Sequence, residues 1–153
     1  DDPGVDSGLM IAQYTQAAIV SELKRLAAPA SVDSIPSSAM QEDHVSMGWS
    51  AARKLRRAVD GLTRVIAVEV LTAARALDLR APLAPAPATA AVVSLLRTGR
   101  APGATEDVEG TGYDPVPGPG PDRFLAPEIE TVVDLVADGA VRRAAETVTG
   151  PLH

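Results

Sequence analysis

The sequence has no cysteine, and this absence excludes a disulfide framework and a metal site built on thiolates. Aromatic residues make up only 3% of the 153 residues, although hydrophobic residues reach 46%. The apolar mass is therefore mainly alanine, valine and leucine. Small aliphatic side chains of this kind favour closely packed helices over the core of a β-sandwich.

Positive charge is also in the minority, and the formal net charge of -6 argues against nucleic acid as the main partner. No run approaches the roughly 20 apolar residues that a membrane span needs, so we expect no membrane partner. There is no basic and apolar leader. We expect a cytoplasmic protein. The chain starts at Asp1 rather than at methionine, so we expect that a segment was removed or that a longer polypeptide contains this chain.

The hydrophobic spacing predicts an all-α protein with no strand and no internal repeat. We expect helices over residues 9–28, 46–79, 88–98, 126–139 and 140–148. Ser7 is a reasonable N-cap for the first helix, and Pro29 should end it near Ala28. Because this helix is apolar on more than one side, we expect it to be buried on several sides.

The helix over 46–79 has the clearest periodicity, with apolar residues that recur every three or four positions from Leu55 to Leu77. It would form a rod of roughly 50 Å, which is longer than a domain of this size needs. Helices with such wide apolar surfaces usually belong to bundles that several subunits share. We therefore divide the chain into bundle helices at 1–80, with a loop at 29–45, and a helical region at 81–153. The latter contains an exposed, mobile Pro/Gly-rich excursion at 100–122.

Polar side chains gather in one short stretch of the predicted loop, at Gln41, Glu42, Asp43 and His44. Two interpretations stay open from composition and spacing alone. A carboxylate here could cap the long helix that follows, where the helix dipole favours negative charge, and Asp43 fits this better because it is shorter. Glu42 could instead line a functional pocket, since long ordered loops often carry function.

Other kinds of site find little support in the sequence. Adjacent Asp43 and His44 would point in different directions on a helix and His153 is terminal, so we expect no metal site. Nothing resembles a Gly-x-Ser-x-Gly elbow or a phosphate-binding glycine loop. The basic cluster at 53–57 could bind phosphate, but no aromatic residues interleave with it. A solvated or subunit-bridging helix face is the better interpretation.

A longer motif allows a family resemblance to be stated. The segment from Pro29 to Gly48, PASVDSIPSSAMQEDHVSMG, closely resembles part of histidine ammonia-lyase, in the aromatic amino-acid ammonia-lyase family. Residues 8–13, 51–54 and 121–128 resemble the same enzyme. The resemblance runs over nearly the whole chain, is weakest at 100–122, and corresponds to the C-terminal portion of that enzyme.

The resemblance implies a mostly helical homotetramer with a central bundle, to which residues 46–79 would contribute one helix. The implied reaction converts L-histidine to trans-urocanate and ammonia. Its electrophile is 4-methylidene-imidazol-5-one, which such enzymes make from their own Ala-Ser-Gly tripeptide. That tripeptide is absent, because Ala30-Ser31 is followed by Val32 and Ser7-Gly8 is preceded by Asp6. We expect no catalytic residue in this chain and no activity of the chain alone.

Glu42 is the one residue to which the resemblance gives a substrate contact. In histidine-specific members a glutamate at this motif position faces the substrate side chain, whereas the phenylalanine and tyrosine enzymes have an amide there. Gln41, Asp43 and His44 would then support the pocket or cap the following helix. Two other functions remain open: a related aromatic amino-acid lyase or aminomutase, and a helical assembly module without catalysis.

Overall fold

A computed structural model describes residues 5–100 and 112–152, and this part of the chain is helical. The order is α1 (Met10–Leu26), a 3₁₀ turn η1 (Ala30–Val32), α2 (Gly48–Asp78), α3 (Pro87–Thr98), α4 (Ala126–Ala137) and α5 (Ala140–Thr149). The described residues contain no strand, only an isolated antiparallel bridge between Ser37 and Glu42. The all-α prediction is confirmed.

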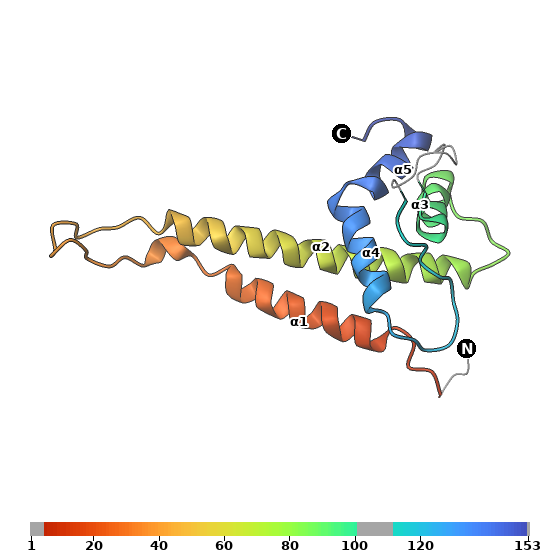
Figure 1. Ribbon diagram of the computed structural model, residues 1–153, viewed down its shortest axis with the longest axis horizontal. Helices are drawn as coiled ribbons and strands as arrows, with labels where there is room; N and C mark the ends of the chain where they lie inside the picture. The colour runs from red at the N-terminus through yellow and green to blue at the C-terminus, as the bar shows by residue number, and fades with distance from the viewer. Residues whose placement is uncertain (1–4, 101–111, 153) are drawn as a thin grey trace.

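The long helix α2 organises the molecule (Figure 1). Its 31 residues give a length of roughly 45 Å. Helix α1 runs antiparallel to it, while α3, α4 and α5 gather around its C-terminal half. Gly61 lets α1 come close, because a Cβ at this position would lie 3.1 Å from Cδ2 of Leu23 and 3.3 Å from Cγ2 of Ile19.

The buried core lies where the C-terminal half of α2 meets the three short helices. Its members are small or aliphatic: Ala67, Leu71, Ala74, Leu95, Leu96, Val116, Val132, Leu135, Ala140 and Ala144. Alanine on several of these helices allows the backbones to approach closely, which explains how a core with so few aromatic residues fills its volume. Residues before and after residue 80 contribute side chains to this core. The division of the chain into 1–80 and 81–153 stays a prediction.

Two predictions about α1 are wrong. Ser7 is not its N-cap, because the helix begins at Met10 after Leu9 and no side chain caps it. Instead, the backbone N–H groups of Ser7 and Gly8 donate to the Asp122 carboxylate at 2.6 and 2.8 Å. Nor is α1 buried on several sides, since only Ala12 is buried. The apolar surface that the sequence carries on α1 stays largely exposed in this chain.

The predicted excursion at 100–122 needs a partial correction. Residues 101–111, with the acidic run at 106–109, lie outside the described part of the chain. Residues 112–122, however, pack on the helices rather than project from them. Val116 is only 1% exposed, and its N–H donates to the Leu96 carbonyl at 2.8 Å. Arg97 pairs with Asp78 and also donates to the Val116 carbonyl at 2.9 Å, so it joins this segment to the end of α2.

The short distance between α1 and α2 can be tested at Gly61. We expect Gly61→Val to lower the free energy of unfolding by about 1–3 kcal/mol, because the added methyl groups would force Ile19 and Leu23 away from α2. Urea denaturation followed by circular dichroism would measure it. Ala73→Val, at an exposed position of the same helix, is the matched control and should change stability little. Equal stability of the two variants would contradict the close packing.

Candidate functional site

The stretch with Gln41–His44 forms a hairpin-like loop that projects beyond the N-terminal end of α2. Figure 1 shows it at the end of the molecule opposite to α3 and α5. The outgoing arm leaves η1, which contacts α2, and the returning arm leads directly into α2. Both arms of the loop are therefore anchored at α2, one through the contact of η1 and the other through the chain itself.

Two sets of hydrogen bonds join the arms. Near the base, the Ser34 hydroxyl accepts from the Val45 N–H at 2.8 Å and donates to the Val45 carbonyl at 3.1 Å. Near the tip, the Ser37 N–H donates to the Glu42 carbonyl at 2.9 Å and the Glu42 N–H donates back at 3.3 Å. Glu42 is thus held by its backbone, and its side chain is left for another partner.

The tip itself has an uncommon backbone. Ser38, Ala39 and Met40 have φ values of 53°, 51° and 66°, in the left-handed region that favours glycine. Three consecutive non-glycine residues in this region store strain, and strain of this kind concentrates at functional sites. The turn reverses the chain immediately before Gln41 and Glu42, and it determines where these two residues emerge.

The candidate side chains all face solvent in this chain. Gln41, Glu42, Asp43 and His44 are exposed, and none of their side chains makes a hydrogen bond or ion pair within the described residues. The capping interpretation is wrong for all four residues, because α2 follows Met47 and has no side-chain cap. No cluster of His, Asp or Glu suited to a metal ion occurs within residues 5–100 and 112–152.

Large apolar side chains near the loop are exposed as well. Met40 and Trp49 are each 75% exposed and Ile35 is 60% exposed. Exposed apolar groups that flank a polar cluster mark a surface which another part of a protein covers. The loop is therefore a candidate surface for such a contact, and no described residue covers the side chains at its tip.

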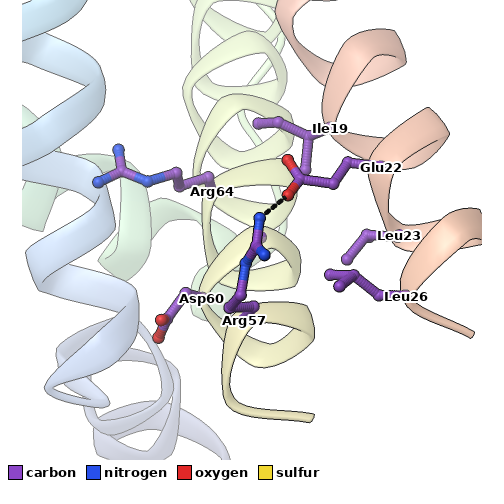
Figure 2. A pocket seen from close by; sticks show the side chains of 8 residues that line it. Ile19, Glu22, Leu23, Leu26, Arg57, Asp60 and Arg64 are labelled. Carbon is purple, nitrogen blue, oxygen red and sulfur yellow. Dashed lines mark hydrogen bonds and ion pairs between the residues drawn. The ribbon is translucent and has the colours of Figure 1, made fainter. Parts of the chain in front are cut away.

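The recesses within the chain lie elsewhere. One of about 270 Å³ lies between α1 and α2 and is drawn in Figure 2. There, Arg57 points across the recess and pairs with Glu22, while Arg64 points away to pair with Glu130 on α4. The hydrogen bond with Glu130 raises the pKa of Arg64. Since Lys54 also donates to the Ala28 carbonyl, two residues of the basic cluster hold α1, in agreement with a structural role.

A larger recess of about 460 Å³ lies at the start of α1, next to the segment that leads into α4. Its floor is apolar, with Ile11, Val68 and Ile129, and the carboxylate of Asp122 lies at its edge, where it binds the first turn of α1. The polar groups here already have partners within the chain.

No described helix is long and apolar enough to cross a membrane.

Comparison with known proteins decides the family. Residues 1–98 match the aromatic amino acid lyase family. The chain belongs to this family. It is 62% identical to histidine ammonia-lyase of Streptomyces avermitilis over 99% of its length, and 64% identical to that of Streptomyces coelicolor over 100%. In both cases the chain spans 27% of the relative.

Solved structures of the family have the same fold. A histidine ammonia-lyase from Trypanosoma cruzi matches with a TM-score of 0.81 and 38% identity, over 96% of this chain and 26% of that one. Tyrosine aminomutase from Streptomyces globisporus also reaches a TM-score of 0.81, with 35% identity over 99% of this chain and 26% of that one. The fold alone therefore does not distinguish these two chemistries.

The sequence located the loop and its polar residues correctly, but it missed what holds them. Gln41, Glu42, Asp43 and His44 are neighbours in the sequence and remain together at the tip, so their proximity could be predicted. Ser34 was not singled out, because a serine among several others in a loop gives no signal of its own. Only the structure shows that its hydroxyl bonds to Val45 across the loop.

Proposed function

We propose that the chain is part of a histidine ammonia-lyase, which converts L-histidine to trans-urocanate and ammonia. The observation that carries the proposal is the identity of 62–64% to histidine ammonia-lyases along essentially the whole chain. Because the chain spans only 27% of these relatives, its residues would supply one portion of the active site. We also propose bundle helices at 1–80, a C-terminal helical region at 81–153, and a cytoplasmic location.

Glu42 is the proposed contact for the substrate side chain. An imidazole ring offers an N–H, and a positive charge when protonated, so a carboxylate can accept a charge-assisted hydrogen bond from it. A phenyl ring offers no donor, and a desolvated carboxylate beside it would be penalised. Because the side chain of Glu42 has no partner within the described chain, it is available for this contact. Gln41, Asp43 and His44 would support the pocket around it.

The electrophile of the family does not fit the residues present here. The family's 4-methylidene-imidazol-5-one group requires Ala-Ser-Gly, which does not occur in the sequence. Ala30 and Ser31 are part of the 3₁₀ turn η1 and are followed by Val32, while Ser7 and Gly8 hold the Asp122 carboxylate. We therefore assign no catalytic residue to this chain, only substrate binding.

Assembly follows from the exposed surface of α2. Leu55, Val59, Leu62 and Ile66 lie on one face of α2, from its second turn to just past its middle, and are between 37% and 65% exposed. A stripe at this spacing suits packing against further helices. We propose that this stripe forms part of a helical bundle between subunits, in a homotetramer, and that the loop tip meets its opposing walls in the same assembly.

A second candidate is a related lyase or aminomutase that acts on another aromatic amino acid. The structural likeness to tyrosine aminomutase favours it. A third is a helical assembly module without catalysis, which the exposed stripe would serve equally well. Glu42 distinguishes histidine from phenylalanine, whose ring offers no hydrogen-bond donor, but not from tyrosine, whose hydroxyl can also donate to a carboxylate. The absorbance of urocanate against that of coumarate separates histidine from tyrosine as the substrate.

Replacement of Glu42 by glutamine tests the substrate assignment. In the full-length protein that carries this chain, we expect Glu42→Gln to lower kcat/KM for L-histidine by about 10- to 100-fold, since one charge-assisted hydrogen bond is lost. Urocanate formation, followed by its absorbance, gives the rate. Glu69→Gln, at an exposed position of α2, serves as the control and should leave turnover unchanged. Unaltered histidine turnover by Glu42→Gln would remove the role proposed for Glu42.

The purified 153-residue chain should not form urocanate from L-histidine. The reason is that it cannot make the electrophile, which needs the absent tripeptide. The assay would use enzyme at micromolar concentration, and a full-length histidine ammonia-lyase such as that of Streptomyces coelicolor would be the positive control. Turnover that co-purifies with the chain and persists after repeated chromatography would contradict this expectation.

Assembly through the stripe predicts that the chain associates at micromolar concentration. Leu55→Ser combined with Leu62→Ser should weaken association at least about tenfold, because two of the four apolar side chains of the stripe are lost. Light scattering coupled to size-exclusion chromatography would report the mass. Val148→Ser, on α5 and also half-exposed, is the control. A wild-type chain that remains monomeric would overturn the proposal.

A further inference from the structure

The loop that carries Glu42 has almost no apolar packing to hold its shape. Along residues 33–46, only Ser34 and Val45 are partly buried, and the other side chains are exposed. The position of Glu42 must therefore come from hydrogen bonds and backbone conformation. The bridge to Ser37 holds the backbone of Glu42 to the outgoing arm, but that arm could still move as a whole relative to α2.

Ser34 provides a contact that ties the outgoing arm to the returning arm. Its hydroxyl both donates to and accepts from the backbone of Val45, so it uses both hydrogen-bonding functions on one residue of the returning arm. Val45 lies three residues before α2 begins at Gly48. The contact therefore holds the outgoing arm close to the start of α2. Ser34 and Val45 are also the only two residues of 33–46 that are partly shielded from solvent.

Two contacts hold the loop, one between Ser34 and Val45 at its base and one between Ser37 and Glu42 near its tip. The Ser34–Val45 contact closes a loop of ten intervening residues, and within it the Ser37–Glu42 bridge closes the strained turn over 38–40. A left-handed turn of three non-glycine residues persists only if its surroundings determine it. Loss of the Ser34 hydroxyl would release the base and let the turn relax, which would shift Glu42.

We propose that Ser34 is a positioning residue, which acts through Glu42 on the recognition of the substrate side chain. This role rests on the proposed contact between Glu42 and the imidazole ring. Ser34 does not itself touch the substrate; it fixes the arm from which Glu42 projects. Binding energy depends on such pre-organisation, because a mobile carboxylate loses entropy when the ligand immobilises it.

A double-mutant cycle in the full-length protein tests the proposal. We expect Ser34→Ala to lower kcat/KM for L-histidine about five- to tenfold, mainly through KM, because two hydrogen bonds that order the loop are lost. In a Glu42→Gln background the same substitution should change kcat/KM less than about twofold, since there is no carboxylate left to position. Ser34→Thr keeps a hydroxyl and should restore activity.

Two further measurements separate positioning from folding. The amide proton of Val45 should exchange with solvent faster in Ser34→Ala than in the wild type or in Ser34→Thr, while the thermal unfolding midpoint stays unchanged. Ser31→Ala provides the matched control, because Ser31 is exposed in η1 and its hydroxyl makes no hydrogen bond within the described chain. This variant should behave as the wild type in every assay.

The outcomes distinguish the two proposals. If Glu42→Gln lowers turnover but Ser34→Ala has an equal effect in both backgrounds, or no effect in either, the positioning role is wrong and the Glu42 contact stands. If Glu42→Gln leaves turnover unchanged, the substrate contact fails and the role of Ser34 fails with it. A Val45 amide that exchanges equally fast in all variants would also overturn the proposal, because it would show that the tie does not order the loop.

Discussion

The direction of α2 depends on the burial of its C-terminal half. Leu71 and the alanines beside it pack against Leu95 and Leu135, and this contact holds the last turns of the rod among the short helices. The position of the N-terminal end of α2 is determined by this contact as well, because a helix is stiff over this length. The loop with Glu42 is carried at a defined distance from the core, although it shares no buried side chain with it.

This arrangement gives the two halves of α2 different roles. The C-terminal half contributes Ala67, Leu71 and Ala74 to a core within the chain. The N-terminal half exposes an apolar stripe and leads back to the loop, so it needs contacts from outside. A single continuous helix thus links a region with a buried core to a region whose apolar stripe is exposed in this chain.

Much of this could be predicted from the sequence, and the exceptions have physical causes. Helix positions followed from periodicity and from Gly and Pro at the ends, as with Gly99 after α3. The exposure of α1 could not be predicted, because an apolar pattern indicates a surface suited to burial and does not show whether this chain covers it. The packing of Val116 was missed because a Pro/Gly-rich composition conceals a single anchoring residue. The stretch with Glu42 could be found because its polar residues are contiguous in the sequence. The hydrogen bonds between Ser34 and Val45 join residues eleven positions apart, so no local sequence pattern indicates them.

The contact of Asp122 with the first turn of α1 has a consequence for the order in which structure forms. Its carboxylate binds N–H groups that are 115 and 114 positions away in the chain. The entropy lost in closing a loop grows with its length, so this contact is among the costliest to form early. It is favourable once α1 and α4 have already docked on α2, when the two partners are neighbours. We therefore expect the beginning of α1 to be secured late in folding, by a residue more than a hundred positions further along the chain.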